Sequence, residues 1–144
     1  MKRLLILAPA LLLALPAMAQ DAPAAGYQNL WCHFAFSITM ASIPPIPAAD
    51  LEAARTAGDA ATPEQIQLIE VDGQIQHIAN GIPTLLETAT AGYTEAGFTT
   101  EQFDTAKAEL DAKVNEQLIG SATAAEFTFE ECLALVAPAE TPAQ

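Results

Sequence analysis

The stretch from Leu30 to Ile43, LWCHFAFSITMASI, constrains the fold of this chain more than any other feature. It contains the only tryptophan of the sequence, and no charged residue occurs between Asp21 and Asp50. Read as a helix, its apolar side chains cover most of the circumference, which is typical of a central, buried helix. We therefore expect a helix at the core of the domain, with Trp31 and Phe34 buried.

One polar seam follows this expected helix. Asn29, His33 and Ser37 are spaced i, i+4 and i+8, so their side chains stack on one face. The seam has two readings. It either faces solvent or is satisfied by local hydrogen bonds, or it forms a small polar site. The first reading is the more common one for such residues.

The N-terminus has the pattern of a secretory signal peptide over residues 1–19. A basic start, Met1-Lys2-Arg3, precedes the apolar run Leu4–Leu15, and small residues then allow cleavage before Gln20. The apolar run is too short to span a bilayer, so we expect no stable membrane anchor after cleavage. The sequence thus predicts a periplasmic or secreted protein, with a flexible leader over 20–25, a helical domain over 26–137 and a disordered tail over 138–144.

Two cysteines, Cys32 and Cys132, remain in the exported chain. An even number of cysteines in an oxidising compartment predicts a disulfide, and this one joins the two ends of the domain. They do not form a CxxC pair, which makes a redox-catalytic role improbable. Two free thiols or a pair of metal ligands are the alternatives.

The rest of the sequence predicts an all-α fold with four main helices and one short helix, packed as a bundle or an irregular orthogonal array. The capping signals Thr62 with Gln65 and Thr99 with Gln102 start two of the helices. We expect Pro83 to kink its helix without breaking it. The expected main helices cover about 25–43, 62–90, 99–119 and a C-terminal segment that starts at Thr123 or Thr128. The short helix covers 48–57, and a loop covers 91–98. The inner face of the helix over 99–119 is expected to carry Phe103, Ala106, Leu110, Val114 and Leu118.

The charge of the chain is strongly acidic. The chain has eighteen acidic residues and five lysine or arginine residues, for a net charge of −13, and cleavage would remove two of these five, Lys2 and Arg3. Such a surface repels nucleic acid and anionic lipids, so we expect neither as a partner. Solubility or adaptation to salt explains this acidity, and a cationic partner is the alternative explanation.

Motifs that carry chemistry are missing from the sequence. There is no CxxCH, HExxH, GxSxG or P-loop pattern, so we predict no catalytic residue and no cofactor. Neither His33 nor His77 has the spacing of a di-iron ligand, and no metal site is predicted. The acidic residues Glu126, Glu130, Glu131 and Glu140 lack the spacing of a calcium loop and fit a solvated face.

These observations favour an exported, non-enzymatic, small helical binding or accessory protein of the bacterial cell envelope, whose partner is an unknown protein or small molecule. The layout of a signal peptide, short helices and one disulfide is shared by small periplasmic acid-stress chaperones, which gives a first alternative. A metal-binding protein or enzyme that uses the Asn29, His33 and Ser37 seam is a second alternative. The sequence does not specify the oligomeric state.

Overall fold

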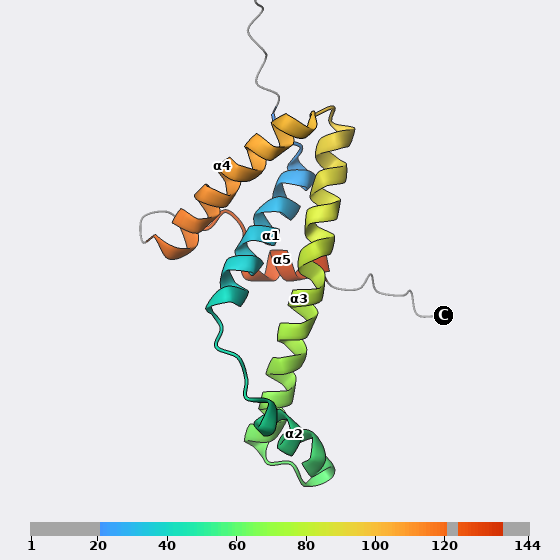
Figure 1. Cartoon of the computed structure of the whole chain (residues 1–144), viewed down its shortest axis with the longest axis vertical. Coiled ribbons are helices and arrows are strands. Elements are labelled where there is room, and N and C mark those ends of the chain that lie inside the picture. The colour runs from blue at the N-terminus through green and yellow to red at the C-terminus, as the bar shows by residue number, and fades with distance from the viewer. Residues whose placement is uncertain (1–20, 121–123, 137–144) are drawn as a thin grey trace, which may run out of the picture.

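The computed structural model describes residues 21–120 and 124–136 of the chain, and these residues are helical with short connections (Figure 1). The signal peptide predicted for 1–19 and the tail predicted for 138–144 lie outside the described residues. The helices are α1 (Ala24–Ser42), α2 (Ala48–Ala57), a 3-10 turn (Gly58–Ala60), α3 (Pro63–Glu95), α4 (Thr100–Ile119) and α5 (Phe129–Val136). The all-α prediction is confirmed, and α1 already begins two residues inside the segment expected as a leader.

Helix α1 is the centre of the fold, as its uncharged sequence predicts. It packs between α3 and α4, and the short α5 runs across α1 and α3 (Figure 1). Trp31 is buried as predicted, but Phe34 is only partly buried. The phenyl ring that is fully enclosed belongs to Phe36, which lies two residues further and therefore on the opposite side of the helix.

Helix α3 is the longest element, and Pro83 lies within it without ending it. The predicted capping box is present: the Thr62 hydroxyl accepts from the Gln65 N–H, and the Gln65 side chain accepts from the Thr62 N–H. The loop predicted over 91–98 is wrong, because the helix continues to Glu95. Gly92 is used for close packing there, since a Cβ at this position would stand 3.2 Å from the Cα of Gly26 in α1.

Gly97, which lies just beyond the last helical residue Glu95, terminates α3, and its positive φ of 86° favours glycine. The N–H of Gly97 donates to the Thr94 carbonyl, and the N–H of Phe98 donates to the Tyr93 carbonyl. This is the Schellman arrangement, and the Phe98 ring completes it by packing edge-on against the buried Tyr93 at 5.0 Å. The capping box of Thr99 then starts α4 directly.

Helix α4 turns a slightly different face inward than its sequence pattern predicts. Leu110 and Val114 are buried as expected, but Leu118 is exposed and Gln117 is buried in its place. The Oε1 atom of Gln117 accepts a hydrogen bond of 2.9 Å from the indole N–H of Trp31. A buried indole N–H needs an acceptor, and this requirement accounts for an amide in the core.

The predicted disulfide between Cys32 and Cys132 is confirmed, with an S–S distance of 1.98 Å, and it fastens α5 to α1. Of the two predicted starts for this helix, Thr128 is correct: its backbone N–H donates to the Glu131 carboxylate, and its hydroxyl accepts from the Glu131 N–H. The far end of α5 packs against α3 at Gly81. A Cβ at Gly81 would come within 2.6 Å of the Val136 side chain, so glycine lets the two helices meet.

Helix α2 stands apart from this core. It contacts α3 and the 3-10 turn, and no contact with α1, α4 or α5 occurs within the described ranges (Figure 1). One side chain of α2, Ala54, is buried against α3. The next residue, Arg55, also binds α3, because its guanidinium donates a hydrogen bond of 2.7 Å to the Asp72 carboxylate.

Candidate functional site

Two apolar hollows lie side by side around one pair of phenyl rings. Phe36 of α1 and Phe129 at the start of α5 pack edge-on at 5.5 Å, and both rings line both hollows. Phe36 is buried, whereas 53% of Phe129 is exposed to solvent. The exposed ring therefore forms a ridge between the hollows, with its inner edge supported by the core.

The first hollow opens between α1, α3 and α5 and has a volume of about 190 Å³. Its α3 wall is built from residues at helical spacing, so their side chains share one face. The lining residues are Phe36, Thr39, Met40, Ile43, Val71, Gln74, Ile75, Ile78 and Phe129. The wall is largely apolar because α1 and this part of α3 both turn their apolar stripes toward it.

The second hollow has the same volume, about 190 Å³, and lies between α1, the end of α4 and the segment that leads into α5. It is lined by Trp31, Ala35, Phe36, Thr39, Leu118, Ala125, Phe127, Thr128, Phe129 and Cys132. Leu118, which the sequence pattern predicts to be buried but which is exposed, is thus part of the wall of this hollow. Exposed apolar side chains gathered at a hollow are a recognised mark of a binding surface.

The polar seam of α1 is engaged with backbone carbonyl groups. The Asn29 amide donates to the Ala25 carbonyl at 2.8 Å, and the Ser37 hydroxyl donates to the His33 carbonyl at 2.7 Å. His33 reaches across to α3, where its Nδ1 lies 3.0 Å from the carbonyl oxygen of Ile82. Because a carbonyl can only accept, His33 carries a proton on Nδ1. Asn29 and Ser37 are thus bonded within α1, only His33 bonds to α3, and the three side chains have separate partners.

A second polar cluster joins residues that the sequence does not bring together. The Tyr27 hydroxyl donates to the Glu126 carboxylate at 2.6 Å, and the Lys113 ammonium donates to the same carboxylate at 2.5 Å and to the Tyr27 oxygen at 2.9 Å. The hydrogen bond from Lys113 holds the pKa of Glu126 below its ordinary value, and the bond to Glu126 raises the pKa of Lys113. Burial, and then the bond to Glu126, raises the pKa of Tyr27.

This cluster changes the reading of the acidic C-terminal region. Glu126 and Glu131 are not simply solvated, since Glu126 binds Lys113 and Glu131 caps α5. The Thr128–Glu131 capping box is visible in the sequence, whereas nothing local indicates a contact between Tyr27 and Glu126. Glu130 is exposed, and Glu140 lies outside the described residues.

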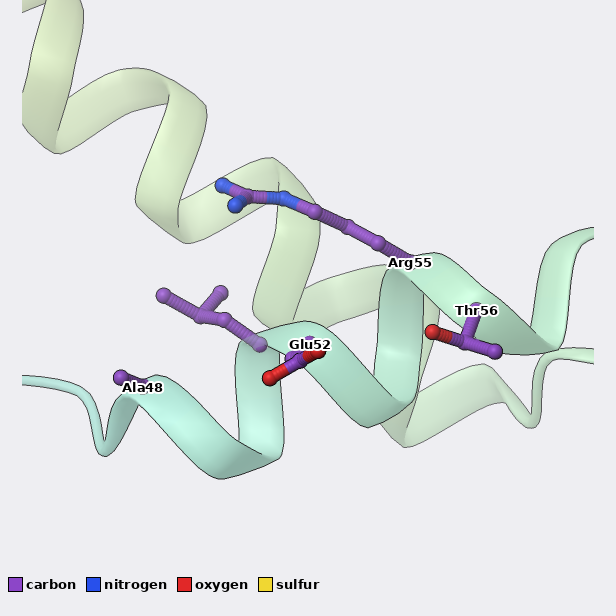
Figure 2. A pocket seen from close by; sticks show the side chains of 5 residues that line it. Ala48, Glu52, Arg55 and Thr56 are labelled. Carbon is purple, nitrogen blue, oxygen red and sulfur yellow. The ribbon is translucent and has the colours of Figure 1, made fainter.

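The hollow shown in Figure 2 has a volume of about 460 Å³ but a different character. All of its lining residues, Ala48, Leu51, Glu52, Arg55 and Thr56, come from α2. The Arg55 side chain extends away toward α3, where Asp72 holds it (Figure 2). A depression on one helix has no opposite wall to enclose a ligand, and for this reason the paired hollows are the better candidate.

Within the described ranges, no three side chains of the histidine, cysteine, aspartate and glutamate types gather closely enough to hold a metal ion. None of the described helices is both long and apolar enough to cross a membrane. No family model, curated protein or solved structure matches this chain. Its function is therefore argued from the site alone.

Proposed function

We propose that this protein is a non-enzymatic binding module and that it binds its partner through the paired hollows around Phe36 and Phe129. The observation that carries this proposal is the exposure of Phe129, a large apolar ring held at 53% exposure between two apolar depressions. Leaving such a ring in water costs the free energy that its burial against a partner would return. An exposed aromatic residue beside pockets is typical of an interface anchor.

The size of the hollows favours a peptide or protein partner. A cavity of roughly 150 Å³ accommodates a benzene molecule, so each hollow of about 190 Å³ has room for about one ring-sized side chain. Pockets for small-molecule ligands are larger, about 300–1,000 Å³. A non-enzymatic role is further supported by the polar seam, because Asn29, His33 and Ser37 are engaged with carbonyl groups.

An uncharged helical peptide with leucine or phenylalanine at positions i, i+3, i+4 and i+7 tests this function. Its binding can be followed by calorimetry and by the fluorescence of Trp31, which lines the second hollow. We expect Phe129→Ser to weaken binding at least about tenfold, the size of a strong interface anchor. Ile119→Ser is the matched control, because Ile119 is 71% exposed and lines neither hollow. Equal effects of the two variants would contradict the proposal.

The cell envelope is the proposed location of this module, on the strength of the signal-peptide pattern and the disulfide. Expression of the full chain in a bacterium, followed by fractionation and N-terminal sequencing, tests it. The expected result is a periplasmic or secreted protein that begins at Gln20. A cytoplasmic protein that retains Met1 would contradict this location.

An acid-stress chaperone is the second candidate, and one observation favours it. Two carboxylates with lowered pKa values, Glu126 and Glu131, hold the segment that leads into α5. That segment covers the core, since Phe127 packs edge-on against Trp31 at 5.5 Å. Reversible binding of a hydrophobic dye near pH 3, with retained far-UV circular dichroism and suppressed aggregation of a client protein, would favour this candidate.

A further inference from the structure

We propose that the partner bound by the paired hollows is a cationic amphipathic helix. This inference rests on the proposed binding function and adds the chemistry of the partner. The charge of the chain, the acidic residues near the hollows and the shape of the two depressions all favour such a partner.

The positive charges of the described chain are already used within the molecule. Each of its three basic side chains forms an ion pair: Arg55 with Asp72, Lys107 with Asp104, and Lys113 with Glu126. The whole chain has 18 acidic residues against five basic ones. An acidic partner would therefore meet net repulsion, with no unpaired lysine or arginine among the described residues to receive it, whereas a basic partner would be attracted over the whole surface.

Acidic residues also flank the hollows themselves. Glu70 precedes Gln74 by four residues on α3, so it continues the same face one turn away from the first hollow. Glu130 is the residue after Phe129 on α5, so its side chain points about 100° away from that ring and lies beside the hollows rather than in them. Both Glu70 and Glu130 are exposed. The α1 wall carries no charged residue at all, since none occurs between Asp21 and Asp50. The surface thus has an apolar floor, and two of the helices that form its walls carry an exposed acidic residue nearby.

The shape of the surface indicates a helix rather than an extended peptide. Two neighbouring depressions, each with room for about one side chain, suit the successive anchors that a helix presents at i, i+3, i+4 and i+7. One common mode for an extended peptide is addition to the edge of a sheet, and the described part of the chain has no strand to offer such an edge. An apolar helix face flanked by lysine or arginine complements both the floor and its acidic surroundings.

Three synthetic helical peptides with one shared apolar face and lysine, glutamine or glutamate at the other positions test this inference. We expect the lysine peptide to bind at least about tenfold more tightly than the glutamine peptide in low salt, and the glutamate peptide to bind most weakly. Glu70→Gln with Glu130→Gln should reduce this preference. Asp104→Asn with Asp111→Asn removes the same number of charges from α4, away from the hollows, and should reduce it less.

A further lysine peptide, with serine replacing its apolar residues, separates specific binding from general attraction. We expect it to bind weakly and to be insensitive to Phe129→Ser. If it binds as tightly as the amphipathic lysine peptide, the inference is overturned. Equal binding of the lysine, glutamine and glutamate peptides, lost in Phe129→Ser, would also overturn it and would leave the proposed function standing. If none of the three peptides shows binding that Phe129→Ser weakens, the proposed function itself is overturned. It is also overturned if the protein forms a dimer with a second copy of itself and Phe129→Ser alone dissociates that dimer.

Discussion

At the scale of single residues, the core depends on one buried polar pair. Trp31 and Gln117 come from different helices and are separated by 86 positions, yet their side chains bond to each other in the interior. The apolar pattern of α4 predicts Leu118 as the inward residue. In the structure Gln117 points inward instead, one residue earlier on the helix. Its side-chain oxygen accepts the hydrogen bond of the Trp31 indole N–H, which a leucine could not do.

Replacement of Gln117 by alanine should lower the free energy of unfolding by about 1–3 kcal/mol, because the indole N–H of Trp31 would lose its acceptor inside the core. Urea denaturation followed by far-UV circular dichroism measures this change. Asn115→Ala is the control, since Asn115 is an exposed amide residue of the same helix and should change stability by less than about 0.5 kcal/mol. Similar losses in the two variants would show that the buried bond contributes little.

The two phenylalanines of α1 should differ in their effect on stability. Phe36 is 1% exposed, so Phe36→Ala should cost about 3–5 kcal/mol through lost burial and the cavity that remains. Phe34 is only partly buried, and Phe34→Ala should cost less. The same denaturation measurement compares the two variants. A larger loss for Phe34 would contradict the packing described for α1.

At the scale of elements, the sequence predicts the bounds of most helices, with the end of α3 as the exception, better than it predicts how the helices pack. The capping boxes of Thr62, Thr99 and Thr128 are local patterns, and each begins a helix as its residues indicate. Gly92 is misread as part of a loop because glycine is also typical of turns. Its actual role is to let α3 approach Gly26 of α1, and only the position of another helix reveals this.

The candidate site is predictable from local sequence patterns to a smaller extent than the helices are. The disulfide is predictable from the count of cysteines and the signal-peptide pattern of the sequence, and the central position of α1 follows from its uncharged sequence. The two hollows are not predictable, because their walls come from four helices and a connecting segment. No local pattern distinguishes an exposed Phe129 from a buried one.

Gly81 and Val136 should be energetically coupled. A Cβ at Gly81 would overlap the Val136 side chain, so Gly81→Ala should destabilise the fold by about 1–3 kcal/mol through overpacking. Combining it with Val136→Gly removes the methyl groups and also the Cβ that the new side chain would overlap, and the loss in the double variant should be smaller than the sum of the single losses. A double-mutant cycle of unfolding free energies measures the coupling. Strict additivity would contradict the contact.

At the scale of the whole molecule, α5 is held at both ends and through its middle. The Tyr27, Lys113 and Glu126 cluster fixes the segment before it, the disulfide fixes Cys132, and Val136 packs at Gly81. These contacts close the chain over a sequence separation of 100 residues. The stability of the short last helix therefore comes from tertiary contacts, as expected for a helix too short to be stable alone.

Loss of the disulfide should be costly. For a loop of 100 residues, the chain-entropy model gives a contribution of about 4–5 kcal/mol. We expect Cys32→Ser with Cys132→Ser to lower the free energy of unfolding by about 2–5 kcal/mol, and reduction of the natural chain to have a similar effect. Chemical denaturation with and without a reducing agent measures both. A change below about 1 kcal/mol would show that the other contacts of α5 suffice.

The stability of the fold should decrease in acid. The pKa of Glu126 is lowered from 4.5 chiefly by its bond from Lys113, so its contribution is present above the unfolded pKa and is lost as the pH falls through the folded one. We expect Glu126→Gln to be less stable at pH 7 and to show a weaker pH dependence between about pH 5 and pH 3. Denaturation at several pH values measures this, with Asp111→Asn as the exposed control. An unchanged slope in Glu126→Gln would contradict the role of this cluster.

The isolated position of α2 has a consequence for the exchange of backbone amide hydrogens. This helix packs on α3 through Ala54 and the ion pair of Arg55 with Asp72, and among the described residues it has no contact with α1, α4 or α5. It can therefore detach while the remaining helices stay packed, at a free energy well below that of global unfolding. Its amides should exchange quickly and with little dependence on denaturant, whereas those around Trp31 should exchange only when the whole chain unfolds. We therefore expect two steps of unfolding, in which α2 detaches first and the helices around Trp31 unfold together afterwards.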